Sequence, residues 1–213
     1  MTSCRIRRVA VVGGTHGNEL TGIYLIDKFQ KFPDLLKRSS FEVVTLLANP
    51  QAVKSNRRYI DRDLNRCFAG EDLSNPELMG YEDRRAKEIS AQLCPKDKHG
   101  ADFIIDLHST TANMGLTILP SSKHLFNLQL LAYLSEIDTS IRVCFGEDYG
   151  EGAPMLRSLS AFGCTIEVGP IAQGVINASL FQQTEKFVHA ILDYLDAKNR
   201  GKLLHTPSNL TVY

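Results

Sequence analysis

Short apolar segments rich in β-branched residues alternate along this chain with segments of helical periodicity, and this alternation limits its possible folds more than any other feature. The apolar runs are nearly continuous, which is typical of strands covered on both faces. They predict strands at residues 9–12, 41–48, 103–107, 116–119, 141–145 and 165–168. The helical segments between them indicate an α/β sandwich with a mixed, mostly parallel sheet flanked by helices.

Helical spacing is clearest in residues 178–197, where the apolar side chains recur on one face. Three further helices are predicted at residues 20–29, 81–93 and 123–137, and the second of these carries a charged face with Glu82 and Asp83. The chain end differs, because Pro207 and a final Leu-Thr-Val-Tyr in residues 201–213 are typical of a strand that is beginning.

Length and composition favour one soluble domain. The chain has 213 residues, and its 24 Lys and Arg balance its 24 Asp and Glu, which gives no reason to expect nucleic acid or an anionic membrane as a partner. Residues 1–8 lack the apolar core of a secretory signal, and no apolar run is long enough for a membrane span. The five cysteines are scattered, without a C-x-x-C pair, so we expect free thiols and a cytoplasmic protein.

The first chemically suggestive residues are His16 and Glu19, which directly follow the first predicted strand in Gly-Gly-Thr-His-Gly-Asn-Glu. Ligand sites of open α/β sheets lie at the carboxyl ends of strands. A separation of three residues also brings an imidazole and a carboxylate to one side of a helical turn. The motif fits neither G-x-G-x-x-G nor a P-loop, so it does not indicate a nucleotide. Taken alone, it is also compatible with a helix-capping turn and an incidental histidine.

His108 strengthens the metal interpretation, because it ends the third predicted strand. Two histidines and a glutamate are a known set of protein ligands for a catalytic zinc ion with one open position. Asp106 lies two residues earlier on the same strand face, where it could orient an imidazole. The alternative is that Asp106 pairs with another buried polar group.

Glu167 is a carboxylate within an otherwise apolar strand. Burying such a group is costly unless something compensates it, and partial burial would raise its pKa toward the range of a general base. The alternative is a glutamate that faces solvent from an edge strand.

Four arginines lie in residues 57–66, and Arg157 lies further along. Arginine recognises carboxylates and developing oxyanions, although composition alone favours a solvated charged loop.

Four motifs together resemble the aspartoacylase and succinylglutamate desuccinylase family, which is related more distantly to the zinc carboxypeptidases. They are GGTHGNELTG at residues 13–22, RYIDRDLNR at 58–66, DLHSTTANMG at 106–115 and IEVGP at 166–170. They occur in the family's order and at roughly its spacing, from about Val9 to the end of the chain. The resemblance implies a zinc-carboxypeptidase-like sandwich.

The resemblance also implies roles for individual residues. His16, Glu19 and His108 match the ligands of one zinc ion per chain. Glu167 matches the general base and proton shuttle, and Arg58 matches the residue that polarises the scissile carbonyl. The matches to the substrate-binding residues are Asn65 and Arg66 for the α-carboxylate, Arg157 for the side-chain carboxylate of aspartate, and Thr110 for the pocket lining.

The chain departs from the family pattern in two places. A tyrosine usually precedes the counterpart of Arg157 by a few residues, whereas here the nearest tyrosine is Tyr149. In the family this tyrosine helps to hold the side-chain carboxylate of the substrate, so its absence affects the preference for aspartate over another acidic residue. Family members also continue into a smaller β-rich domain. We therefore expect residues 1–204 to form the catalytic domain and residues 205–213 to begin a carboxy-terminal β domain otherwise absent from this chain.

The function implied is zinc-dependent hydrolysis of an N-acyl-L-amino acid, with N-acetyl-L-aspartate as the first candidate substrate. The alternatives are desuccinylation or carboxypeptidase-type cleavage by the same metal chemistry, and a non-catalytic module that binds zinc or anions. The expected partner is a small N-acyl amino acid, with no nucleic acid and no membrane. A homo-oligomer is compatible with the sequence.

Overall fold

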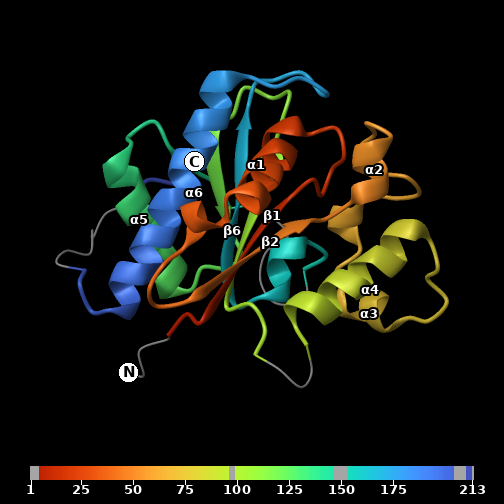
Figure 1. The fold of residues 1–213 in the computed structure, drawn as a ribbon, viewed down its shortest axis with the longest axis horizontal. Helices are drawn as coiled ribbons and strands as arrows, with labels where there is room; N and C mark the ends of the chain where they lie inside the picture. The colour runs from red at the N-terminus through yellow and green to blue at the C-terminus, as the bar shows by residue number, and fades with distance from the viewer. Residues whose placement is uncertain (1–4, 96–98, 146–152, 204–209, 213) are drawn as a thin grey trace.

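The structure is a computed structural model that describes residues 5–95, 99–145, 153–203 and 210–212. Its centre is a six-stranded sheet in the order β2-β1-β3-β6-β4-β5. Strands β2, β1, β3 and β6 are parallel, whereas β4 runs antiparallel to β6 and is parallel to β5. In Figure 1, helices α5 and α6 lie to one side of the strands and α3 and α4 to the other. The predicted fold class, a mixed, mostly parallel sheet flanked by helices, is confirmed.

The strands and helices follow the predicted alternation closely. The strands are β1 (Arg8–Gly13), β2 (Glu42–Leu47), β3 (Phe103–Ser109), β4 (Gly115–Pro120), β5 (Arg142–Val143) and β6 (Phe162–Gly169). The α-helices are α1 (Leu20–Lys31), α2 (Pro50–Lys54), α3 (Gly70–Ser74), α4 (Tyr81–Leu93), α5 (Leu125–Ile137) and α6 (Ala178–Asn199). Short 3₁₀ turns are η1 (Pro33–Leu36), η2 (Leu64–Arg66) and η3 (Leu156–Leu159).

Small differences from the predicted bounds have local causes. Helix α5 begins at Leu125 rather than at residue 123, because the His124 side chain accepts a hydrogen bond from Phe126 N and so caps the helix. The fifth strand is shorter than predicted. The five-residue helices α2 and α3 were not predicted, because so short a helix shows no apolar periodicity.

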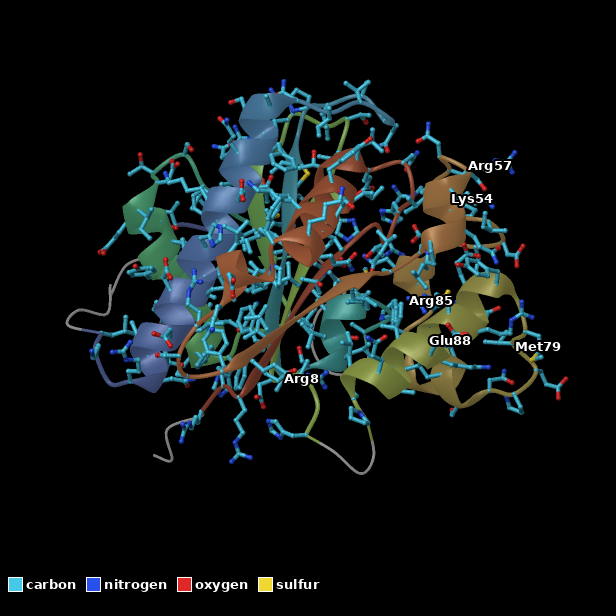
Figure 2. The ribbon with its side chains drawn as sticks, viewed as in Figure 1. Arg8, Lys54, Arg57, Met79, Arg85 and Glu88 are labelled. Carbon is cyan, nitrogen blue, oxygen red and sulfur yellow. The ribbon has the colours of Figure 1, made fainter. Side chains whose placement is uncertain are left out.

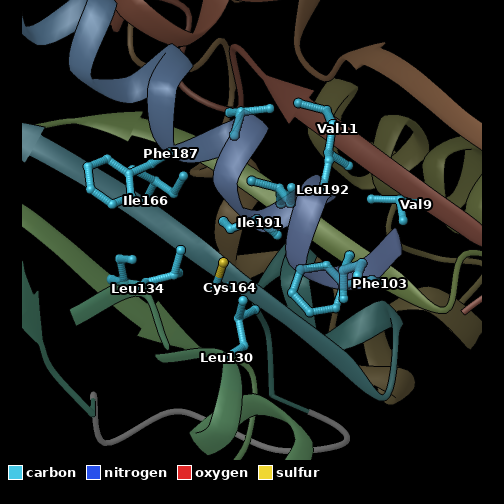
Figure 3. Close-up of a cluster of buried hydrophobic side chains, with 14 of the residues drawn as sticks. Val9, Val11, Phe103, Leu130, Leu134, Cys164, Ile166, Phe187, Ile191 and Leu192 are labelled. Carbon is cyan, nitrogen blue, oxygen red and sulfur yellow. The ribbon is translucent and has the colours of Figure 1, made fainter. Parts of the chain in front are cut away.

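Two apolar cores lie on opposite faces of the sheet. The larger core joins β1, β3, β4 and β6 to helices α1, α5 and α6, through side chains such as Val11, Phe103 and Ile191 (Figure 3). The smaller core packs Ala10, Val12 and Ile104 of the other face against η2, α4 and η3. Burial on both faces explains why the strand sequences are nearly continuous in apolar residues.

Polar residues interrupt this pattern on the face of the smaller core. Successive side chains of a strand point to opposite faces, so Asp106 and His108 of β3 share one face, as do Thr165 and Glu167 of β6. The parallel register pairs Asp106 with Thr165 and His108 with Glu167. The sheet therefore presents four polar side chains together toward the carboxyl ends of two neighbouring strands.

The cysteines, the helices and the carboxy-terminal residues bear on three predictions about the whole chain. The four described cysteines, Cys67, Cys94, Cys144 and Cys164, are free. Across the described ranges, the structure contains no helix of sufficient length and hydropathy to cross a membrane. Residues 210–212 form no strand, and the other residues of the proposed carboxy-terminal β domain, 205–209 and 213, lie outside the described residues.

Candidate active site

The loop between β1 and α1, residues 14–19, carries two of the predicted metal ligands and is called the ligand loop here. Gly14 has φ = +69°, a conformation that favours glycine. At Gly17 a Cβ would collide with the backbone of Ala52 and Val53, so only glycine lets the loop pack this closely against α2. Both glycines thus help to place His16 and Glu19, which are buried.

His16, Glu19 and His108 come together as one group, called the metal group here. Their candidate ligand atoms all lie within 4.8 Å of one another. His16 Nδ1 lies 2.6 Å from Glu19 Oε1, and His108 Nδ1 lies 3.0 Å from Glu19 Oε2. The two Nδ1 atoms are 3.2 Å apart. The residues predicted from the ligand loop and from the end of β3 therefore share one buried point.

A carboxylate fixes each imidazole from the opposite side. His108 Nε2 donates to Asp106 Oδ2 at 2.8 Å, and His16 Nε2 donates to Asp63 Oδ1 at 2.9 Å. Because carboxylates only accept, each Nε2 carries a proton, so in the neutral form of each ring the lone pair would be at Nδ1. The Nδ1 atoms, which lie beside the Glu19 carboxylate, are therefore the atoms that would bind a metal ion. This arrangement of donors fits a zinc ion with histidine ligands oriented by carboxylates, and the predicted contact between Asp106 and an imidazole is confirmed.

The charges of the group also favour a cation. Burial alone would lower the pKa of His108, but the carboxylates of Asp106 and Glu19 outweigh it and raise this pKa well above its usual value. Burial likewise raises the pKa of Glu19, and contacts with His108 and His16 more than reverse the effect. Three carboxylates, those of Glu19, Asp63 and Asp106, contact the two imidazoles, and this surplus of negative charge favours a cation.

A cavity of about 220 Å³ opens beside this group. Its lining combines metal-ligand candidates with a carboxylate, an amide, three guanidinium groups and two apolar side chains. The lining residues are His16, Arg58, Asn65, Arg66, His108, Leu119, Met155, Arg157, Thr165 and Glu167. All but one of the predicted catalytic and substrate-binding residues therefore surround the same space.

Glu167 lies on the cavity wall and belongs to an interior strand. Strand β6 pairs with β3 on one side and β4 on the other, so the alternative of a solvent-facing glutamate on an edge strand is wrong. Burial raises the pKa of Glu167 above its usual value, and the positive field of His108 only partly opposes this. Its Oε2 atom is buried without a hydrogen-bond partner among the described residues. Such an atom is available to a water molecule or a substrate.

Residues 57–66, called the arginine loop here, supply the cationic and amide groups of one wall. Arg58 donates from Nη2 to Asp63 Oδ2 at 3.1 Å and from Nη1 to Glu19 Oε1 at 3.4 Å. Asn65 Oδ1 accepts from Leu156 N at 2.8 Å, which leaves its Nδ2 hydrogens as donors. Arg66 Nη1 lies 3.1 Å from Met155 Sδ. The wall is therefore suited to anionic groups.

Arg157 is only 5% exposed, although its guanidinium group reaches the cavity. Burial lowers its pKa, while the negative charges of Asp106 and Glu167 oppose that shift. Its Nη1 donates to Thr165 Oγ1 at 3.3 Å.

Thr110 is the predicted residue that does not line the cavity, since its hydroxyl instead accepts from Ala112 N. Tyr149 lies outside the described residues.

Sequence reasoning missed four residues of the site. Asp63 lies within the predicted arginine motif, but its spacing gives no indication that it would reach His16. Thr165 lies two residues before Glu167, so strand periodicity could have placed it on the same face. Leu119 and Met155 reach the cavity from β4 and from the residue before η3, which the sequence does not bring together.

A family model described as the succinylglutamate desuccinylase/aspartoacylase catalytic domain matches residues 5–195. The chain belongs to this family. A probable aspartoacylase from Nostoc sp. is 50% identical over 98% of the chain and 71% of its own length. A human N-acyl-aromatic-L-amino acid amidohydrolase (carboxylate-forming) is 40% identical over 92% of the chain and 63% of its own length. Both relatives are named as enzymes that hydrolyse acylated amino acids.

Solved structures agree with the family assignment. The crystal structure of murine aminoacylase 3 has a TM-score of 0.86 and 39% identity, and the match covers 92% of this chain and 67% of that one. A succinylglutamate desuccinylase from Chromobacterium violaceum has a TM-score of 0.69 at 20% identity, covering 98% of this chain and 65% of that one, which shows a shared fold alone. The zinc-carboxypeptidase type of fold expected for the family is therefore confirmed.

Proposed function

We propose that this protein is a zinc-dependent amidohydrolase that cleaves N-acyl-L-amino acids, with N-acetyl-L-aspartate as the preferred substrate. One observation supports the proposal more than any other. A single cavity contains the histidines of the metal group, the half-buried carboxylate of Glu167 and three arginines. Metal-assisted hydrolysis of an amide that carries carboxylates requires these three kinds of group in one place.

The arginine loop and η3 would bind the substrate. Asn65 and Arg66 would donate hydrogen bonds to the α-carboxylate, which every N-acyl amino acid has. Arg157 would hold the side-chain carboxylate, because a buried guanidinium group gains most from an anionic partner. In this orientation the acyl amide would lie between these arginines and the pair formed by His108 and Glu167, which line the same cavity.

His16, Glu19 and His108 would hold a zinc ion, which supplies Lewis acidity and makes water a better nucleophile at neutral pH. Glu167 accepts a proton from the water molecule as its oxygen attacks the acyl carbonyl carbon. Arg58 donates hydrogen bonds to the carbonyl oxygen as negative charge develops there. The carbon–nitrogen bond then breaks, and Glu167 returns the proton to the leaving nitrogen. The products are a carboxylate and a free amino acid.

A second substrate class is also favoured by specific observations. Leu119 and Met155 give the cavity an apolar side, and one relative is named for N-acyl-aromatic amino acids. The rival to N-acetyl-aspartate is therefore an aromatic N-acyl amino acid, cleaved by the same chemistry. Arg157 decides our choice, because its guanidinium group reaches the cavity and could bind a side-chain carboxylate, which an aromatic substrate lacks.

The test is a comparison of kcat/KM for N-acetyl-L-aspartate, N-acetyl-L-phenylalanine and N-succinyl-L-glutamate, with the released amino acid as the readout. We expect the highest value for N-acetyl-aspartate. A higher value for N-acetyl-phenylalanine would assign the enzyme to the aromatic class, and a higher value for N-succinyl-glutamate would make it a desuccinylase. Absence of turnover with all three would support a binding module.

The proposed location is the cytoplasm, in keeping with the free thiols of the described cysteines.

A further inference from the structure

A carboxylate outside the cavity is buried as completely as any group in the molecule. Glu82, on α4, is 0% exposed. Its Oε1 accepts from Ile60 N at 2.7 Å and from Asn49 Nδ2 at 3.0 Å. Its Oε2 accepts from Asp61 N at 2.9 Å and from Arg62 N at 3.4 Å. Four N–H donors therefore compensate the burial of one negative charge.

Three of these donors are consecutive backbone amides of the arginine loop. They lie between Arg58 and Asp63, in the middle of the segment that supplies residues to the cavity wall. Backbone amides bound to a fixed acceptor restrict the position of the chain itself, not only of one side chain. Because α4 packs against the sheet through the smaller core, Glu82 connects the arginine loop to a rigid element.

The fourth donor, Asn49, extends the connection to the ligand loop. Asn49 N donates to Gly14 O at 3.0 Å, and the Asn49 side chain also caps α2 by accepting from Ala52 N. A second link joins the two loops directly, because Gly17 N donates to Arg58 O at 3.2 Å. Glu82 and Asn49 thus lie between the loop with the metal ligands and the loop with the cationic groups.

We propose that Glu82 is a positioning residue, which sets the arginine loop at the distance from the ligand loop that catalysis requires. The proposal rests on the function proposed above. Glu82 touches neither the cavity nor the metal group, so it would act through Arg58, Asn65 and Arg66. Arg58 would affect the chemical step, and Asn65 with Arg66 would affect binding of the α-carboxylate. Displacement of the loop should therefore change both kcat and KM.

The first experiment is Glu82→Gln. The amide has the same shape, but its NH₂ group must face one of the two pairs of N–H donors. We expect kcat/KM to fall about 10- to 100-fold for every N-acyl amino acid that the wild type cleaves, since a displacement near 1 Å can cost ~10² in rate. With zinc in excess, zinc content should remain near that of the wild type, because His16, Glu19 and His108 lie on other segments. Zinc affinity should fall only as far as the displaced loop weakens the bond between Asp63 and His16.

A matched control is available on the same helix. Glu88 forms an ion pair with Arg85 at 2.9 Å, and its side chain is 64% exposed. Figure 2 shows the two residues together on α4. The variant Glu88→Gln removes the same charge from the same helix without touching the arginine loop. Its kcat/KM and zinc content should both equal those of the wild type.

A purely structural role would give a different result from a positioning role. It would lower the melting temperature of Glu82→Gln but leave kcat/KM of the folded, zinc-loaded protein unchanged when measured well below that temperature. Unchanged kcat/KM would therefore overturn the proposal. Amide hydrogen exchange gives a readout that does not depend on activity, because the amides of Ile60 and Asp61 should exchange faster in the variant than in the wild type.

Glu82→Asp covers the case in which the glutamine variant does not fold. It keeps the charge and the acceptors but withdraws the carboxylate by one methylene, so we expect a smaller loss of kcat/KM in the same direction and faster exchange at Ile60 and Asp61. Wild-type values of both quantities, or failure of both variants to fold, would overturn the proposal. A different result would show that the proposed function is wrong, namely a wild-type protein that cleaves none of the substrates.

Discussion

Glu167 lies directly opposite His108 in the parallel pairing of β6 with β3. Both side chains point to the face of the sheet that carries the cavity, so backbone pairing alone places the half-buried carboxylate of Glu167 next to the metal group. The geometry needs no flexible loop, because both residues belong to interior strands. In the proposed role of general base, Glu167 would be in position before any substrate binds.

Glu167→Gln should keep the metal and lose most of the turnover. The amide is nearly the same size as the carboxylate but cannot accept a proton, and a general acid–base residue typically contributes ~10² to 10⁴ in rate. Zinc analysis and kcat for N-acetyl-aspartate test this together. A near-normal kcat in the zinc-loaded variant would require a different base.

The activity should fall at acidic pH because of the same residue. Burial raises the pKa of Glu167, and only the deprotonated form can accept a proton from water. The acidic limb of the kcat/KM profile should therefore lie above the pKa range of an exposed glutamate, and activity should be lost as the pH falls through it. Zinc content measured at each pH separates this effect from loss of the metal. An acidic limb at the value of an exposed glutamate would contradict the assignment.

The carboxylates behind the two imidazoles should strengthen metal binding. Asp106 and Asp63 each accept a hydrogen bond from an Nε2 atom of a candidate ligand. Replacement of such a partner typically costs ~10- to 100-fold in metal affinity or activity. We expect Asp106→Asn and Asp63→Asn to show weaker zinc binding in a competition with a chelator.

The control for these variants is Asp61→Asn, which changes a carboxylate of the same loop that bonds to Tyr81 N and to no histidine. Its zinc affinity should match that of the wild type. If Asp106→Asn and Asp63→Asn also bind zinc normally, then the two carboxylates do not orient metal ligands.

Substrate selection should separate Arg66 from Arg157. Arg157→Ala should lower kcat/KM for N-acetyl-aspartate and N-acetyl-glutamate far more than for N-acetyl-methionine, which has no side-chain carboxylate. Arg66→Ala should lower all three, because each substrate has an α-carboxylate. Wild-type protein should prefer N-acetyl-aspartate to N-acetyl-glutamate only weakly. An equal loss for all three substrates in Arg157→Ala would make that residue structural.

The sequence predicted the larger elements well for a physical reason. Apolar runs such as 103–107 and the helical spacing of 178–197 are local patterns, and each corresponds to an element that packs against the core. The antiparallel direction of β4 could not be predicted in this way, because nothing in residues 116–119 distinguishes an antiparallel strand from a parallel one. The family resemblance, rather than any single residue, predicted that His16, Glu19 and His108 form one group, and the structure brings these three residues together.

The remaining parts of the site depend on contacts between distant segments. Glu82 and Asp83 were predicted to lie on a charged helix face, yet both are buried, because the arginine loop covers Glu82 and Arg62 pairs with Asp83. Asp63 likewise reaches His16 across a separation of 47 residues. Such contacts leave no local pattern in the sequence, and only the folded chain brings them together.

The most direct test of the central claim is removal and restoration of zinc in one preparation. Protein as purified should contain about one zinc ion per chain, because two histidines and one carboxylate form a complete set of protein ligands for a catalytic site. Release of aspartate from N-acetyl-L-aspartate should stop after chelation and return when one equivalent of zinc is added. The double variant His16→Ala, His108→Ala should bind no zinc and recover no activity. Undiminished aspartate release by the chelated, zinc-free protein would contradict the account.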